Sequence, residues 1–163
     1  MLPLRAILWT VLLPGTVAVY LPSVILRRTE APAPGAWGAP PSVGLLLMIA
    51  GTAILLRCIR DFAVVGRGTL SPIDAPRKLV VAGLYRYVRN PMYVGVTMVL
   101  VGEVLFFKSL ALLEYTVVWF GVVNLFVLFY EEPTLKRRFG ESYDRYRRSV
   151  GRWIPGRRFD TTQ

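Results

Sequence analysis

Two apolar runs joined by only two residues constrain the fold of this chain more than any other feature. The first run extends from Pro91 to Phe107 and the second from Leu110 to Tyr130, with Lys108-Ser109 between them. As helices they would be about 25 Å and about 31 Å long, which suits the thickness of a bilayer. The sequence therefore predicts two membrane-spanning helices in a tight antiparallel hairpin.

A third apolar block, from about Ala6 to Leu26, lies near the N-terminus. It contains Pro14 and Pro22 and predicts a kinked membrane helix, with a cleaved signal peptide as the alternative. The turn-rich segment from Glu30 to Ser42 that follows predicts a connecting loop.

A fourth apolar block begins near Val43, is apolar to Leu56 and predicts another membrane helix. It continues into a charged turn in which Arg57 and Asp61, one helical turn apart, are expected to pair. Residues 66–76 are rich in turn-forming types and predict a loop.

The segment after Glu132 is basic and aromatic. A helix of this kind lies on an anionic membrane surface or packs back on the protein, and the pattern alone leaves both open. Its apolar residues are spaced by three or four positions and predict one helical face; they are Leu135, Phe139, Tyr143, Tyr146 and Val150.

Together these features predict an all-α fold, a polytopic membrane helix bundle with a cytoplasmic C-terminal helical tail. We expect about four transmembrane helices, or five if a broken segment lies near the N-terminus. The chain would form a single membrane domain over residues 1–163. Its parts would be two N-terminal spans (1–65), a cytoplasmic loop with the binding motif (66–90), the transmembrane hairpin (91–130) and a tail that completes the site (131–163).

The distribution of positive charge predicts the orientation. Sixteen of the twenty Lys and Arg residues lie between Arg57 and Arg89 or after Tyr130, and the positive-inside rule places both regions in the cytoplasm. The net charge of +10 alternates with apolar blocks, as in membrane proteins, so no nucleic-acid partner is expected. We expect an integral protein of the plasma (inner) membrane.

Two residue types are scarce. The chain has no histidine and a single cysteine, Cys58. This composition excludes an intrachain disulfide, Ser-His-Asp catalysis and His-ligated zinc, and no metal site is predicted.

A charged and aromatic stretch stands at the start of the hairpin. Asn90 followed by Pro91 predicts a helix N-cap and a first helical residue, with Arg89 beside them. The free N–H groups and the positive dipole end of such a helix start favour a small anionic group. The hairpin would bring Glu131 and Glu132, at the end of the second apolar run, to the same face.

The two carboxylates predict either ion pairs with the basic tail or a ligand site. As a ligand site they would hold an ammonium group or ribose hydroxyls, while Tyr85 and Tyr93 would contact an aromatic or sulfonium group. Tyr87 is more simply an interface anchor. Such a face suits a zwitterion with an adenosyl group, and S-adenosylmethionine is one of many amphiphiles that would fit.

Several stretches of the sequence resemble the signature of the isoprenylcysteine carboxyl methyltransferase family, and related phospholipid N-methyltransferases share the general pattern. The match covers roughly Arg77 to Pro155, about half of the chain. The stretches are Leu79–Gly95 (LVVAGLYRYVRNPMYVG), Glu131–Leu135 (EEPTL), Phe139–Tyr143 (FGESY), Tyr146 and Arg152–Pro155 (RWIP).

The resemblance implies a helical membrane methyltransferase that uses S-adenosylmethionine and accepts a lipophilic small molecule or a lipid from the bilayer. No catalytic residue is assigned. The charge pattern adds Arg89 to the residues that the family carries over by position. Those cofactor-binding residues would be Arg77, Lys78, Leu79, Val80, Tyr85, Asn90, Pro91, Tyr93, Glu131 and Glu132.

Two positions depart from the family pattern. Asn90 stands where the family often has histidine, and asparagine can still cap and donate. Val127 stands where isoprenylcysteine enzymes have an arginine that helps to hold the substrate, and residues 126–130 contain no cation. The alternatives are therefore a phospholipid (ethanolamine-type) N-methyltransferase and a non-catalytic membrane subunit or transporter that retains the scaffold.

Overall fold

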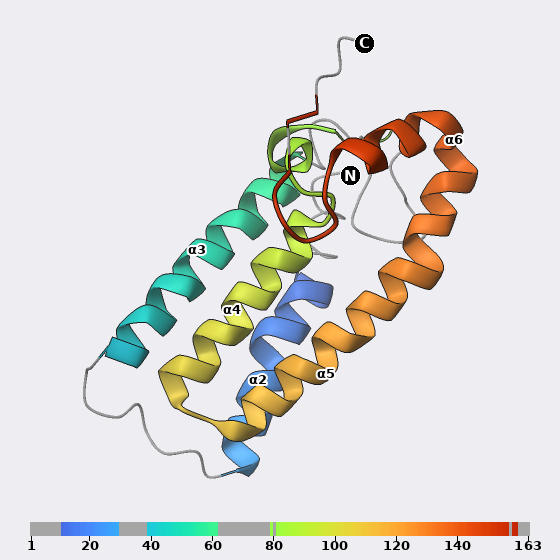
Figure 1. The fold of residues 1–163 in the computed structure, drawn as a ribbon. Helices are drawn as coiled ribbons and strands as arrows, with labels where there is room; N and C mark the ends of the chain where they lie inside the picture. The colour runs from blue at the N-terminus through green and yellow to red at the C-terminus, as the bar shows by residue number, and fades with distance from the viewer. Residues whose placement is uncertain (1–10, 30–38, 62–78, 80, 157, 160–163) are drawn as a thin grey trace.

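The computed structural model describes residues 11–29, 39–61, 79, 81–156 and 158–159 (Figure 1). Over these residues the fold is all-α, as predicted, and the pairing of Val88 with Gly151 is an isolated bridge rather than a strand. The elements are η1 (Val11–Tyr20), α2 (Leu21–Arg28), α3 (Ala39–Asp61), η4 (Gly83–Arg86), α4 (Pro91–Phe107), α5 (Leu110–Phe126), η5 (Val127–Glu131) and α6 (Glu132–Ser149).

Helices α3, α4 and α5 lie side by side, α2 packs against α5, and η1 packs against α4 (Figure 1). A buried apolar cluster joins η1, α3 and α4, and includes Ala18, Leu55 and Leu100. In the described part of the chain, two helices are long and apolar enough to cross a membrane: α3, and the helix that begins with α5. Helix α4 is apolar but shorter, with 17 residues.

The predicted hairpin is present. Helix α4 begins at Pro91 and ends at Phe107, as the sequence predicts. Lys108 then adopts the left-handed conformation, with φ of 50°, which ends the helix. Ser109 begins α5 by accepting a hydrogen bond from the backbone N–H of Leu112 at 3.4 Å, a side-chain N-cap.

The prediction that the fourth helix ends at Tyr130 is wrong. The helix passes through one wide π turn, η5, and continues as α6. Glu131 and Glu132 therefore do not lie at a helix C-terminus. Pro133 suggests a stop because its ring clashes with the carbonyl four residues earlier, and the wide turn before it relieves that clash.

The predicted loop from Glu30 to Ser42 is also partly wrong. Helix α3 begins at Ala39, so Pro40, Pro41 and Ser42 lie in its first turn, where the missing proline N–H groups would have no helical partner anyway. The rest of that loop, the loop at 66–76 and residues 6–10 lie outside the described residues. The predicted pair of Arg57 and Asp61 is confirmed, at 3.4 Å.

Two pairs of glycines bring α3 and α4 into close contact. A Cβ added to Gly44 would lie 2.6 Å from the carbonyl oxygen of Gly102, and one added to Gly51 would lie 2.6 Å from that of Gly95. The two glycines of each helix are seven residues apart, about two helical turns, so both lie on the face toward the partner helix. Small residues at such positions allow the backbones to approach, as in membrane helix pairs.

Helix α6 packs back on the protein. Tyr143, Tyr146 and Val150 are buried, with Leu135 and Phe139 packed against them. The predicted apolar face is therefore confirmed, and of its two interpretations the packed one is correct. Leu79, Val81 and Phe159 complete this cluster. Gly140, with φ of 52°, bends the helix in the middle.

We predict that Gly51→Ala and Gly102→Ala destabilise the protein by about 1–3 kcal/mol, because the added methyl groups push two backbones apart. Gly121→Ala in α5 is the matched control, since nothing lies within 4 Å of its new Cβ. Thermal unfolding in detergent measures both. Equal midpoints for all three variants would show that the close approach does not stabilise the fold.

Candidate functional site

The Glu132 carboxylate is held between two arginines. Arg89 Nη1 lies 2.9 Å from Glu132 Oε1, and Arg152 approaches both oxygens, with Nε at 2.7 Å from Oε1 and Nη2 at 3.0 Å from Oε2. The side chains of Glu132 and Arg89 are 7% and 10% exposed. This buried three-residue cluster joins the start of α4, the start of α6 and the segment after α6.

The neighbouring carboxylate has a different environment. Glu131 is half-buried, and its Oε2 accepts a hydrogen bond from the Tyr93 hydroxyl at 3.1 Å. Burial and the charge of Glu132 raise the pKa of Glu131, and the hydrogen bond from Tyr93 offsets this only in part. Burial also raises the pKa of Glu132, but the hydrogen bond from Arg152 and the charge of Arg89 outweigh it and leave that pKa below its ordinary value. Two adjacent acids thus differ in proton affinity.

Asn90 occupies the N-cap position of α4, as predicted, but its side chain makes no capping hydrogen bond. Its Nδ2 instead donates to the backbone carbonyl of Arg152 at 3.3 Å. The backbone N–H of Arg89 donates to the carbonyl of Gly151 at 2.9 Å. The helix start therefore binds the C-terminal segment, which we define as residues 150–159.

Tyr85 packs against α3, and its pKa is raised by burial, by Cys58 and, to a lesser degree, by the charge of Glu131. Its ring is buried against Cys58 of α3, and its carbonyl accepts a hydrogen bond from the Tyr146 hydroxyl at 2.6 Å. Tyr87 is 41% exposed. The structure therefore brings Arg89, Asn90 and Tyr93 together with the two glutamates, but it places the Tyr85 ring in the contact between η4 and α3.

Trp153 of the C-terminal segment is inserted beside α4 and α5. Its Nε1 donates to Asn124 Oδ1 at 3.0 Å, and its ring lies 6.3 Å from that of Tyr93 and 5.5 Å from that of Phe120. The Trp153 ring is half-buried among these side chains.

An open apolar groove of about 190 Å³ begins at Trp153. Val94 also lines it. Trp153 connects the groove to the Tyr93–Glu131 pair, because its ring lies against that of Tyr93. The remaining lining residues come from α3, α4 and α5, and they are Leu47, Thr97, Met98, Val101 and Phe120.

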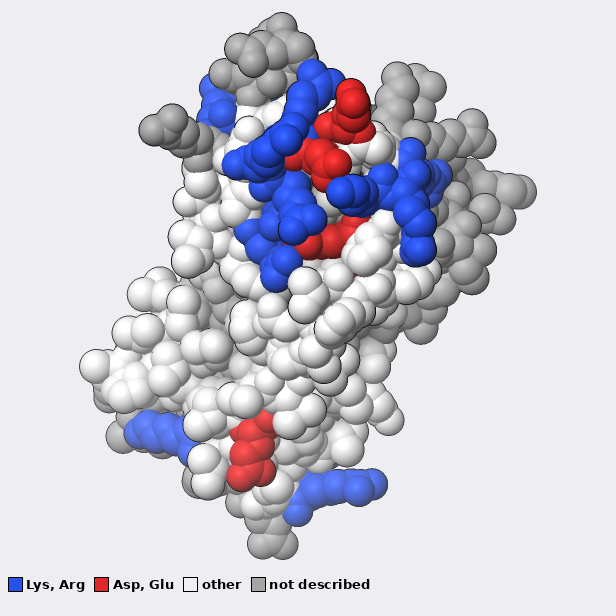
Figure 2. Space-filling model, turned by 45° about the vertical axis from the view of Figure 1, so that its right-hand side comes forward, with Lys and Arg blue, Asp and Glu red and all other residues white. Residues whose placement is uncertain are grey.

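The other predicted site residues are placed as follows. Pro91 is buried at the start of α4, and Leu79 packs against the Tyr143–Tyr146 cluster. Arg77, Lys78 and Val80 lie outside the described residues. Figure 2 shows acidic residues surrounded by Lys and Arg on one end of the molecule.

Sequence reasoning assigned no role to Arg152 or Asn124. Arg152 lies 20 residues after its partner Glu132, and Trp153 lies 29 residues after Asn124. The family signature at Arg152–Pro155 is the sequence feature that points to Arg152. Its polar side chain within an apolar helix is the feature that points to Asn124.

This arrangement can recognise a zwitterion. Arg89 and Arg152 contribute two positive charges, and Glu131 and Glu132 contribute two negative charges when both are ionised. Both arginines contact Glu132, whereas Glu131 accepts a hydrogen bond from the neutral Tyr93 hydroxyl, so the two carboxylates have different partners. The apolar groove beside Tyr93 adds a place for an aliphatic chain.

We predict that Glu132→Ala costs about 3–5 kcal/mol of stability, because it leaves two arginines without their buried partner. The control Asp144→Ala removes the exposed pair of Asp144 with Lys136 and should cost at most about 1 kcal/mol. Chemical unfolding in detergent measures both. Glu132→Ala should also expose the chain after Ser149 to trypsin, and equal behaviour of the two variants would contradict the role given to Glu132.

A family model described as phospholipid methyltransferase matches residues 40–142, which is more than half of the 163 residues. The matched region contains the start of α4 and both glutamates of the site. No curated protein and no solved structure matches the chain. The resemblance seen in the sequence motifs is confirmed, and the chain belongs to the phospholipid methyltransferase family.

Proposed function

We propose that this protein transfers a methyl group from S-adenosylmethionine to the amine head group of a lipid. The observation that carries the proposal is the position of the Tyr93–Glu131 pair, at the junction of a charge-balanced cluster and an apolar groove. The family is one of membrane methyltransferases that act on lipid-like substrates. In that chemistry the charged cluster would bind the methyl donor and the apolar groove would bind the lipid.

The charged cluster fits the methyl donor by its chemistry. Arg89 and Arg152 would face the carboxylate of S-adenosylmethionine, and Glu131 would face its ammonium group or ribose hydroxyls. Arg89 Nε supports this assignment, because it is buried and has no hydrogen-bond partner among the described residues. Arg77, Lys78, Leu79, Val80, Tyr85, Asn90 and Pro91 remain the family-based proposals for further contacts.

When bound, S-adenosylmethionine supplies an electrophilic methyl group on a sulfonium that is already a good leaving group. The protein then has to align the acceptor and exclude water. Trp153 covers the site from the C-terminal segment, fixed by its hydrogen bond to Asn124 and its contact with Tyr93. The groove would hold the aliphatic chain of the acceptor and direct its head group toward Glu131.

An amine acceptor must lose a proton before it can attack. Glu131 is the proposed acceptor of that proton, because its partner Tyr93 packs against Trp153 of the groove and the raised pKa of Glu131 makes it a stronger base than an ordinary glutamate. Tyr93 holds one carboxylate oxygen and leaves the other for the substrate. The proton would pass from the ammonium nitrogen to Glu131 and then to solvent.

A carboxylate acceptor, as in isoprenylcysteine methylation, is the second candidate. It needs no base but does need a cation beside the groove. Val127 is 0% exposed and stands where isoprenylcysteine enzymes carry arginine, and Arg152 is already bound to Glu132. The missing cation at Val127 favours the amine. A non-catalytic subunit or transporter is the third candidate, and donor binding tests it.

The proposed topology has four spans, or five if a broken segment lies near the N-terminus, and a cytoplasmic site. The charge asymmetry of the sequence supports this orientation. The division into N-terminal spans, loop, hairpin and tail belongs to the same proposal. An integral location in the plasma (inner) membrane follows from it.

We expect purified protein to bind S-adenosylmethionine and S-adenosylhomocysteine in a calorimetric titration, and Glu131→Ala and Asn90→Ala to weaken binding by about tenfold, the equivalent of one charge-assisted hydrogen bond. Glu141→Ala, at an exposed position of α6, is the control. A wild-type protein that binds neither compound would exclude both enzyme candidates and leave the non-catalytic one.

We expect methyl transfer to an ethanolamine phospholipid in vesicles and none to a prenylated cysteine. The rate should rise with pH as Glu131, whose pKa is raised, loses its proton. Glu131→Gln should lower kcat by about 10²-fold or more and abolish that part of the pH profile. Radiolabelled methyl incorporation measures this, and methylation of only the prenylcysteine would reverse the assignment of the acceptor.

A further inference from the structure

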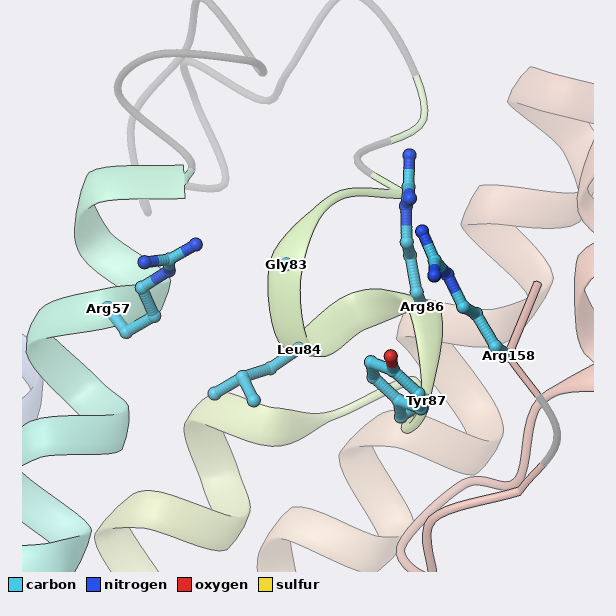
Figure 3. Close-up of a pocket in the computed structure, with 6 residues that line it drawn as sticks. All are labelled: Arg57, Gly83, Leu84, Arg86, Tyr87 and Arg158. Carbon is cyan, nitrogen blue, oxygen red and sulfur yellow. The ribbon is translucent and has the colours of Figure 1, made fainter. Parts of the chain in front are cut away.

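A second open cavity lies where α3 ends. Its volume is about 580 Å³, and it shares no lining residue with the apolar groove. The described residues that line it are Arg57, Gly83, Leu84, Arg86, Tyr87 and Arg158 (Figure 3).

Three separate parts of the chain contribute one arginine each to this cavity. Arg57 comes from the last turns of α3, Arg86 ends η4, and Arg158 belongs to the C-terminal segment. Figure 3 shows Arg86 and Arg158 extending side by side in the same direction, with Arg57 reaching in from the opposite side. No carboxylate is present among the described lining residues, so the cavity concentrates positive charge.

Backbone hydrogen bonds fix this arrangement. The N–H of Phe159 donates to the carbonyl of Arg86 at 2.9 Å, and the N–H of Gly156 donates to the carbonyl of Tyr87 at 2.8 Å. These two bonds hold the C-terminal segment along η4 and bring Arg158 next to Arg86. The convergence of charge is therefore built into the fold rather than being a chance arrangement of long side chains.

The described residues neutralise Arg57 and Arg86 only in part. Arg57 contacts Asp61 through its Nε at 3.4 Å, yet its side chain remains 52% exposed. Arg86 Nε is buried and has no hydrogen-bond partner among the described residues. Gly83, with φ of 55°, leaves the cavity wall without a side chain at the point nearest the Asp61 carboxylate.

We propose that this cavity binds a phosphate ester, and that the phosphate belongs to a lipid head group at the membrane surface. Guanidinium groups match phosphate oxygens with paired hydrogen bonds, which an ammonium group cannot reproduce. Arg57 follows the apolar part of α3 by one residue, so the cavity opens at the depth of the lipid head groups. Methyl transfer does not require this site, so the proposal goes beyond the proposed function.

The test measures lipid retention by native mass spectrometry of the full chain in detergent. The probes are phosphatidic acid, diacylglycerol with the same acyl chains, and glycerol 3-phosphate. We expect phosphatidic acid to be retained and diacylglycerol to be lost. Arg86→Gln and Arg158→Gln should each weaken retention about tenfold. Arg57→Lys keeps a positive charge beside Asp61 but removes the planar guanidinium group. This variant should also weaken the retention of phosphatidic acid.

Arg148→Gln is the matched control, because Arg148 is an exposed arginine of α6 outside the cavity. Equal binding of glycerol 3-phosphate and phosphatidic acid would support the phosphate site but assign it to a soluble ligand. Equal retention by the wild type and all variants would overturn the proposal. So would competition by S-adenosylhomocysteine, which would assign the cavity to the methyl donor. Lipid retention is measured without S-adenosylmethionine, so its result does not depend on whether the protein binds the methyl donor.

Discussion

Glu132 is the residue on which the arrangement of the polar end depends. Its carboxylate neutralises Arg89 at the start of α4 and Arg152 after α6, so one side chain joins three parts of the chain that the helices alone would leave apart. A buried ion pair contributes little net stability over an apolar replacement, but loss of one partner is costly because a charge remains buried. The interaction therefore specifies where the C-terminal segment lies more than it raises the stability of the fold.

The position of that segment determines what the rest of the site contains. Arg152, Trp153 and Arg158 all come from it, and each reaches a different neighbour: Glu132, Asn124 of α5, and the cavity beside η4. The apolar bundle provides the frame, in which glycine pairs bring α3 against α4. The C-terminal segment thus positions these charged and aromatic groups against the helix bundle, and the ion pair of Arg152 with Glu132 joins the segment to α6.

The sequence predicts local features of the fold well where a physical signal is confined to a few residues. Both bounds of α4 follow from Asn90-Pro91 and from the short link at Lys108-Ser109, and the buried face of α6 follows from its spacing. The errors at Ser42 and Tyr130 have one origin: proline predicts a helix break, but the first turn of α3 and the wide turn before Pro133 accommodate it. The sequence predicts ion pairs between the glutamates and the basic tail as one alternative, and Glu132 forms one with Arg152. It does not predict which arginine pairs, because nothing local fixes contacts between residues 20 positions apart.

The wide turn at Val127–Glu131 determines which way the two glutamates face. A π turn holds one residue more than an α-helical turn, and one residue corresponds to about 100° of rotation around the helix axis. Losing that residue would keep the apolar length of α5 and the pattern of α6, yet it would turn the two acids and the whole of α6 relative to α4. Chain-length differences at this turn among relatives should therefore change the geometry of the candidate site, even where every motif is intact.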